Sequence, residues 1–230
     1  MQLIAMLTML IDHLGYVFFP DERWMRIVGR IAFPIYCYLL VVGYQRTRSK
    51  PRYAFRLFIL ALISQLPFMF AFITDGVNVI GTLFVALLVI LFIDHFKGNP
   101  ELQVLLAFLA LAAIYVPLNM LNFDYAIYGV LTVLVYRYLP SAIGMLAGQF
   151  VLNVLFIFVL HFNSPIQFYS LLPTLFIAGL KLSAPEAKTE VRLPRWLWRA
   201  FYPAHLAIIA LIEWWLNGEI YEEYVRWLFM

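Results

Sequence analysis

Asp12 and His13 are adjacent ionisable residues inside an apolar run that extends from Gln2 to Phe19. A helix that begins at Gln2 and rises about 1.5 Å per residue places Asp12 about 15 Å along its axis, near the middle of a hydrocarbon layer about 30 Å thick. An unpaired Asp at that depth costs at least about 2.5 kcal/mol, so such groups pair, face a bundle interior or take part in chemistry. We interpret His13 as a general base, with Asp12 holding the imidazole or bonding to another helix. The alternative is a buried polar contact that joins two helices.

Arg30 is a third ionisable residue within an apolar run, in the segment WMRIVGRIAFPIY. A buried guanidinium needs an anion, and the candidates are Asp12 and an anionic ligand. Gly29 permits close backbone approach, and Pro34 frees a backbone carbonyl near the same place. The sequence therefore predicts either an Arg30–Asp12 pair or a ligand contact here.

The motif FYPAH opens the last apolar run and contains a second candidate base, His205. Tyr202 lies three residues before His205, so the two side chains can face inward together. The other histidines, His95 and His161, lie at the ends of apolar runs, where we expect interfacial positions. The spacing of the four histidines matches no metal-binding motif, so we expect no metal site.

Other polar residues mark the ends of apolar runs or interrupt them. Asn78 precedes one run, Asp124 and Tyr125 precede another, and Tyr128 follows one turn later. Each is weak evidence alone, because polar side chains often bond within their own helix.

The composition indicates an all-α, polytopic integral membrane protein that forms a single domain over residues 1–230. Hydrophobic residues make up 64% of the chain and charged residues 13%, whereas soluble domains carry about 25% charged residues. The one cysteine, Cys37, excludes an internal disulfide and a multi-cysteine metal site. The basic charge comes from loops and does not indicate a nucleic-acid partner; the expected surroundings are a lipid bilayer.

Nine apolar runs are candidates for transmembrane helices, several of them short. They are Gln2–Phe19, Met25–Tyr44, Tyr53–Ile73, Val79–His95, Glu101–Pro117, Tyr125–Leu139, Ala142–His161, Ile166–Leu180 and Leu197–Leu216.

The basic residues predict the orientation of these nine spans, because loops rich in Lys and Arg stay cytoplasmic. Twelve of the 16 fall on one side: Arg46, Arg48, Lys50, Arg52, Arg56, Lys97, Arg137, Lys181, Lys188, Arg192, Arg195 and Arg199. The other side carries Arg23, Arg26 and Arg226. We therefore expect a cytoplasmic N-terminus and an external C-terminus. In the long linker Lys181–Arg199, Trp196 and Trp198 predict an amphipathic stretch on the cytoplasmic surface before the last helix.

Several motifs together resemble the TraX family of integral membrane acyltransferases. They are MLIDHLG at 9–15, GRIAFPIYCYLLVVGY at 29–44, RTRSKPRYAFRL and ALISQLPF within 46–68, NVIGTL at 78–83, DYAIYG at 124–129 and FYPAH at 201–205. The resemblance spans nearly the whole chain and implies a multi-pass protein of the bacterial plasma membrane that transfers acetyl groups. The family's namesake acetylates the amino terminus of conjugative pilin, and more distant relatives pass acetyl from cytoplasmic acetyl-CoA across the bilayer.

This resemblance implies acetyl-CoA as the acyl donor and an amine-bearing small molecule or peptide as the acceptor, with an amino group favoured over a hydroxyl. The polyanionic donor should dock on the cytoplasmic side, where Arg137, Arg195, Arg199 and the cluster at 46–56 supply cations. The acceptor should enter from the outside near Asn78, Asp124, Tyr125 and Tyr128. Arg30 or Tyr202 would stabilise the oxyanion.

His13 would act either as a general base in direct transfer or through an acetyl-histidine intermediate, and both routes stay open. The chain could also pair as a homodimer. The competing hypothesis is a proton-coupled transporter in which Asp12, His13 and Arg30 form a proton relay. Transporters often contain inverted repeats, and the absence of a visible repeat speaks against this alternative.

Overall fold

The computed structural model describes residues 1–161, 163–183, 194–219 and 224 of the 230-residue chain. The regular elements among these residues are all helices, with no strand, as the sequence predicts. The helices are α1 (Gln2–Phe18), α2 (Arg23–Gly29), α3 (Ala32–Arg46), α4 (Lys50–Phe72), α5 (Val79–His95), α6 (Pro100–Met120), α7 (Ala126–Tyr138), α8 (Ala142–Val154), α9 (Leu171–Ser183) and α10 (Arg195–Leu216). A π-helical turn, Leu155–Val159, extends α8, and a 3₁₀ segment, Pro165–Ser170, leads into α9.

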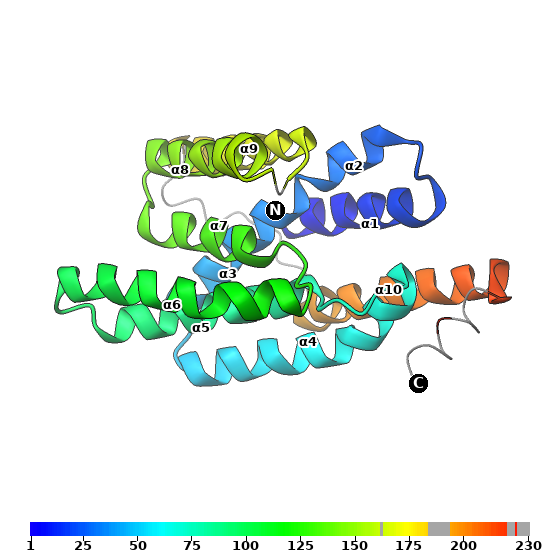
Figure 1. Cartoon of the computed structure of the whole chain (residues 1–230), viewed down its shortest axis with the longest axis horizontal. Coiled ribbons are helices and arrows are strands. Elements are labelled where there is room, and N and C mark those ends of the chain that lie inside the picture. The colour runs from blue at the N-terminus through cyan, green and yellow to red at the C-terminus, as the bar shows by residue number, and fades with distance from the viewer. Residues whose placement is uncertain (162, 184–193, 220–223, 225–230) are drawn as a thin grey trace.

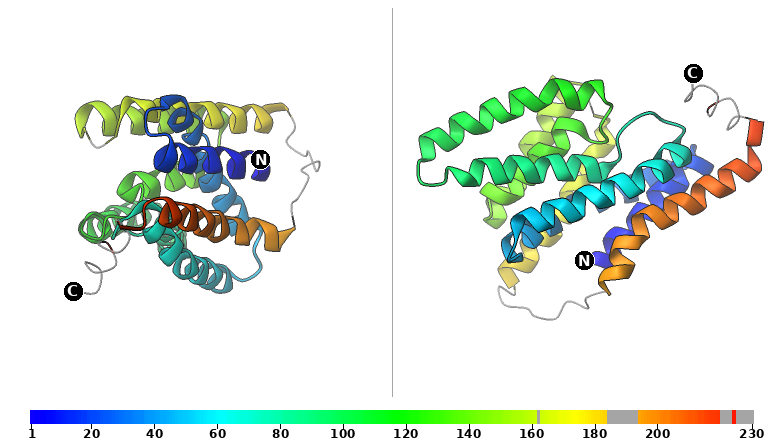
Figure 2. Two further views of the ribbon diagram at one scale, coloured as in Figure 1. Left: turned by 90° about the vertical axis from the view of Figure 1, so that its right-hand side faces the viewer. Right: turned by 90° about the horizontal axis from the view of Figure 1, so that it is seen from below.

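The helices form two groups, and α3 crosses between them (Figure 1). One group contains α1, α2, α8 and α9, and the other contains α4, α5, α6 and α10. Within these groups α8 packs on α9, α1 packs on α2, and α4 packs on α10. Helices α4 and α10 lie side by side when the molecule is seen from below (Figure 2). Buried residues of α3, α5 and α7, among them Leu87, Ile90 and Val130, join the two groups in a common apolar core.

Five helical segments are long and apolar enough to cross a bilayer. They are Arg23–Arg46, Lys50–Phe72, Pro100–Met120, Ala142–Val159 and Pro165–Leu182. Helices α1, α5 and α7 are apolar but have only 13 to 17 residues. The count of nine transmembrane helices and the positions of the termini stay predictions.

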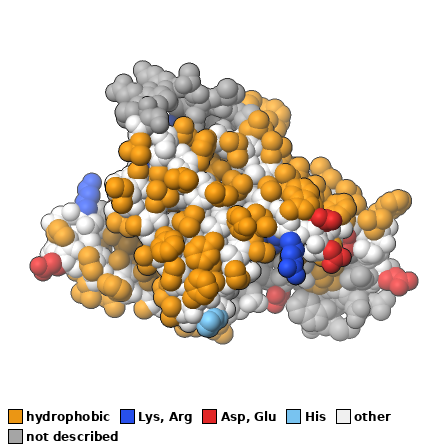
Figure 3. Space-filling view, turned by 90° about the horizontal axis from the view of Figure 1, so that it is seen from above, with side chains coloured by type: hydrophobic (Ala, Val, Ile, Leu, Met, Phe, Trp, Pro, Cys, Tyr) orange, Lys and Arg blue, Asp and Glu red, His pale blue; other side chains and the backbone are white. Residues whose placement is uncertain are grey.

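The surface of the molecule also resembles that of a membrane protein. Hydrophobic side chains cover the broad middle of the face in Figure 3, and most of its acidic and basic side chains lie toward the two ends. On α6, Phe108 is 69% exposed and Leu109 is 56% exposed. Such extensive apolar surface is unfavourable in water and favourable against lipid.

The second predicted span is broken in two, with α2 ending at Gly29 and α3 beginning at Ala32. Pro34 explains the break, because proline lacks an N–H and its ring collides with the carbonyl four residues earlier, here that of Arg30. The chain therefore turns at Arg30, which lies at the junction between the two helices rather than within one of them.

At its described end, the amphipathic stretch that the sequence predicts before the last helix is part of that helix. Trp196 and Trp198 belong to the first turns of α10 itself, and Trp198 stacks on Tyr36 of α3 with ring centroids 5.1 Å apart. Residues 184–193 of the predicted linker lie outside the described part of the chain.

Candidate active site

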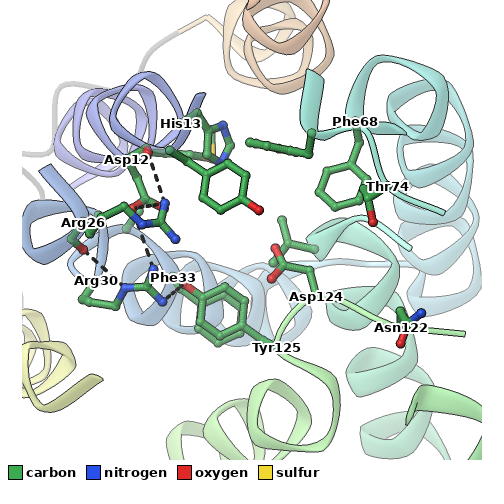
Figure 4. A pocket seen from close by; sticks show the side chains of 16 residues that line it. Asp12, His13, Arg26, Arg30, Phe33, Phe68, Thr74, Asn122, Asp124 and Tyr125 are labelled. Atoms are coloured by element: carbon green, nitrogen blue, oxygen red, sulfur yellow. Dashed lines mark hydrogen bonds and ion pairs between the residues drawn. The ribbon is translucent and has the colours of Figure 1, made fainter. Parts of the chain in front are cut away.

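A cavity of about 300 Å³ lies between α1, α2, the start of α3, α4 and the loops at 73–78 and 121–125 (Figure 4). Its polar lining contains His13, two acids and two arginines; the acids are Asp12 and Asp124, and the arginines are Arg26 and Arg30. Aromatic side chains, including Phe33, Phe68, Phe72 and Tyr125, form much of the remaining wall. Charged side chains thus converge on a cavity that is part polar and part aromatic, which makes it the candidate ligand-binding or catalytic site.

His13 and His205, from opposite ends of the chain, form a hydrogen bond of 2.8 Å between His13 Nδ1 and His205 Nε2. His205 Nδ1 lies 2.6 Å from the carbonyl oxygen of Phe201. A carbonyl can only accept, so His205 carries its proton on Nδ1 and accepts at Nε2. His13 must then donate from Nδ1, which leaves a lone pair on His13 Nε2. The arrangement orients His13 as a base or nucleophile.

Aromatic rings enclose this histidine pair. The His13 ring packs edge-on against Phe72, with centroids 5.0 Å apart, and against Tyr202 at 6.3 Å. Phe201 stacks on the His205 ring at 4.7 Å. Tyr202 is buried and packs beside the pair, and it is not among the residues that line the cavity.

Asp12 pairs with arginine and does not hold the imidazole, whose Nδ1 is taken by His205. Asp12 Oδ1 lies 2.8 Å from Arg26 Nη1 and 3.8 Å from Arg30 Nη2. Gly29 allows this approach, because a Cβ at residue 29 would overlap the Asp12 carboxylate. The predicted Arg30–Asp12 pair is present, and Arg26 is the closer partner.

Arg30 uses most of its donors on protein acceptors. Its Nε bonds the carbonyl of Arg26 at 3.3 Å, and its Nη1 bonds the Tyr125 hydroxyl and Gln167 Oε1, each at 3.3 Å. Guanidinium has five N–H groups, so the two on Nη2 remain, and Nη2 faces Asp12 only at 3.8 Å. Nη2 is therefore the part of Arg30 with hydrogen-bonding capacity to spare.

Asp124 faces the two arginines from the other side of the cavity (Figure 4). Its loop is fixed by its own backbone: the Asp124 N–H bonds the Val77 carbonyl at 2.9 Å, and the Thr82 hydroxyl bonds the Asp124 carbonyl at 2.5 Å. Burial raises the pKa of Asp124 to about 6, against the opposing effect of Arg30. Next to it, Tyr125 stacks on Phe33 with centroids 3.8 Å apart.

The remaining residues predicted from the sequence lie elsewhere. Asn78 is fully buried and caps α5, accepting from the N–H groups of Ile80 and Gly81. Tyr128 belongs to a buried polar cluster behind the cavity. Arg199 is exposed near the start of α10, and the side chain of Arg195 lies outside the described part of the structure.

Arg137 also lies away from the cavity, in an ion pair of 2.6 Å with Asp94. The same carboxylate accepts hydrogen bonds from Tyr44 at 2.8 Å and Tyr138 at 2.9 Å. These contacts join the ends of α3, α5 and α7. The contribution of Arg137 to donor binding stays a prediction.

Several polar residues of the site were missed by the sequence reasoning; besides Arg26 and Gln167 they include Tyr16, Thr74 and Asn122, which line the cavity. Arg26 was counted only as a loop charge, although it lies one helical turn before Arg30, a spacing that places both on one face of a helix. Gln167 was absorbed into the apolar run at 166–180, where a lone amide was the available signal. Neither partner could be assigned, because both contacts join separate elements.

The family model described as TraX protein matches residues 1–213. The chain is 28% identical to the probable fimbrial assembly protein FimC, serogroup H1, of Dichelobacter nodosus over 239 residues, which covers 91% of this chain and 92% of that protein. It is 46% identical to an uncharacterized protein of Rickettsia prowazekii over 35 residues, covering 15% and 14% of the two chains. No solved structure matches. The resemblance found in the sequence motifs is thus confirmed, and the chain belongs to the TraX family.

Proposed function

We propose that this protein is a membrane acyltransferase that moves an acetyl group from acetyl-CoA to the amino group of an acceptor, with His13 as the catalytic base. The observation that carries the proposal is the Nε2 lone pair of His13 in a cavity that also holds Arg30 and Asp124. Family membership and the similarity to a protein described as a probable fimbrial assembly protein support it.

Each polar group has a role in direct transfer. His13 Nε2 takes a proton from the acceptor amine as the nitrogen attacks the thioester carbonyl. The C–N bond forms, Arg30 Nη2 stabilises the negative oxygen of the tetrahedral intermediate, and the C–S bond breaks. The thiolate of CoA then receives the proton from His13. In the two-step route, His13 Nε2 itself attacks the thioester and the C–S bond breaks to release the CoA thiolate. The amine then attacks the acetyl-histidine, the bond to Nε2 breaks, and the amine proton passes to the thiolate.

His205 is a positioning residue in this mechanism, because its Nε2 accepts the His13 proton and its Nδ1 is fixed by a backbone carbonyl. It replaces the carboxylate that usually orients a catalytic histidine. Asp124 attracts the ammonium form of the acceptor, which gives one proton to water before the neutral amine attacks. The two rim loops at 73–78 and 121–125 form the entrance for the acceptor.

The donor approaches from the cytoplasmic side in this proposal. A cavity of about 300 Å³ is at the lower limit of ligand sites, so it holds the acetyl thioester and the end of the acceptor rather than the whole donor. The nucleotide end stays with cytoplasmic cations such as Arg195, Arg199 and Arg137.

Acetyl transfer by purified protein in detergent tests the function. The substrates are labelled acetyl-CoA and trialanine, which has a free amino terminus, with N-acetylated trialanine as the control acceptor. We expect labelled product from trialanine alone, and a loss of about 100-fold or more in kcat for His13→Ala. His95→Ala removes an exposed histidine outside the cavity and serves as the matched control.

Retained activity in His13→Ala together with its loss in His205→Ala would transfer the role of base to His205. Absence of turnover with every amine, combined with proton-driven flux into vesicles, would favour the transporter instead.

A further inference from the structure

A cluster of buried polar side chains lies behind the cavity, where α7, α8 and the 3₁₀ segment Pro165–Ser170 meet. Its members are Tyr128, Gln149, Asn153, Gln167 and Ser170, none of them more than 4% exposed. None of them lines the cavity. Uncharged polar groups at such depth are unfavourable without hydrogen bonds, and apart from Gln149 Oε1, which has no partner among the described residues, the side chains of the cluster bond to one another.

The hydroxyl of Tyr128 is the centre of the cluster. It accepts from Gln149 Nε2 at 2.7 Å and from Gln167 Nε2 at 3.0 Å, and it donates to Asn153 Oδ1 at 2.8 Å. One donated and two accepted bonds use the full capacity of a phenolic hydroxyl.

These bonds fix the orientation of the Gln167 amide. With its NH₂ group directed at Tyr128, Gln167 presents Oε1 to Arg30 Nη1 at 3.3 Å. The flipped amide would place N–H groups against a guanidinium, which has only donors, and an oxygen against a hydroxyl whose proton is already given to Asn153. The cluster thus allows a single orientation, and it reaches the cavity wall through this one bond to Arg30.

We infer that Gln167 is a positioning residue for Arg30: the Tyr128 cluster holds the Gln167 carbonyl against Nη1, so that Nη2 stays directed at the reacting oxygen. The inference rests on the proposed function, in which Arg30 stabilises the oxyanion. Donors in such sites act through their fixed placement, and a shift of about 1 Å lowers the rate strongly.

Steady-state kinetics with acetyl-CoA and trialanine test this inference through four variants. Gln167→Met removes the acceptor for Arg30 while keeping the volume of the side chain. Gln167→Glu keeps an oxygen toward Nη1. Thr174→Val is the matched control, because it removes a fully buried hydroxyl that bonds to Tyr136 at 2.7 Å and to the Ser170 carbonyl at 2.9 Å and does not contact Arg30. Arg30→Gln measures the role of the guanidinium itself.

We expect Gln167→Met to lower kcat about 10- to 100-fold, with the KM for acetyl-CoA changed less than about threefold. Gln167→Glu should have a kcat between those of Gln167→Met and the wild type, because a carboxylate accepts from guanidinium but cannot donate to the Tyr128 hydroxyl. Thr174→Val should have the kcat and the KM of the wild type, even if thermal unfolding shows that it loses as much stability as Gln167→Met.

The outcomes separate the two levels of the argument. A loss of kcat in Arg30→Gln without a loss in Gln167→Met overturns the positioning role and leaves the acyltransferase proposal intact. An equal loss of kcat in Gln167→Met and Thr174→Val also overturns it, since the effect would then come from general destabilisation. An unchanged kcat in Arg30→Gln overturns the oxyanion role and with it this inference, and acetyl transfer by the wild type still decides the function.

Discussion

Asp124 stands out among the single residues because it is an acid held in a buried loop opposite two arginines. Burial raises its pKa to about 6, so its carboxyl is largely protonated below that pH and ionised above it. Only the ionised form attracts an ammonium group. The acceptor should therefore bind more tightly as the pH rises through about 6.

We expect the KM for trialanine to fall as the pH is raised from about 5 to about 7, as Asp124 loses its proton. The side chain introduced by Asp124→Asn cannot ionise, so this variant should have a high KM for trialanine that does not fall as the pH is raised. Initial rates over this pH range measure the effect, and the variant also reports any separate titration of the histidines. If the KM of Asp124→Asn falls over the same pH range, the titrating group is not Asp124.

The polar residues of the first two spans could be identified from the sequence, because an ionisable group in an apolar run has a high free-energy cost unless it has a partner or a function. Asp12, His13 and Arg30 all line the cavity. The Arg30–Asp12 pair was one of the two predicted alternatives for Arg30, whereas the closer contacts, Asp12 with Arg26 and His13 with His205, depend on the rotation of each helix, which the sequence does not give. Gln167 could not be assigned to the site from the sequence, because its hydrogen bonds join three elements that are distant in the sequence.

The helices themselves follow closely from hydropathy, and each of the nine predicted runs contains a described helix. Differences occur where one residue overrides the pattern, as Pro34 does by ending α2. Helix starts follow side-chain caps, with Asn78 before α5, Asn99 before α6 and Ser141 before α8.

The ends of α3, α5 and α7 are joined through Asp94, and this contact yields a prediction about Arg137. Arg137→Met should lower the free energy of unfolding by about 1–2 kcal/mol, because it leaves the nearly buried Asp94 carboxylate without its cation. The estimate is modest because a quarter of the Arg137 side chain is exposed. Thermal unfolding in detergent measures it.

Asp94→Asn and the double variant complete the cycle and isolate the pair. A raised KM for acetyl-CoA in Arg137→Met, with unchanged stability, would instead support the donor-binding role that the sequence predicts for this residue.

The whole molecule has an uneven distribution of basic residues, which predicts a cytoplasmic N-terminus and a cavity rim on the external side of the membrane. Because Cys37 is the single cysteine and is fully buried, a Cys37→Ala background supports single-cysteine labelling. In intact cells, a membrane-impermeant maleimide should label Glu22→Cys and should label Lys97→Cys only after permeabilisation. Both positions are exposed in the structure. The reverse labelling pattern would invert the topology and bring the acceptor from the cytoplasm.

The two rim loops are tied to each other by an isolated bridge between Val77 and Phe123, with backbone bonds on both sides of it. Replacing either loop alone would therefore break the backbone hydrogen bonds that hold the other loop. A chimaera in which 73–78 and 121–125 are both replaced by the loops of a relative should acquire the acceptor preference of that relative. A chimaera in which only one of the two loops is replaced should fail to fold and so gain no new preference.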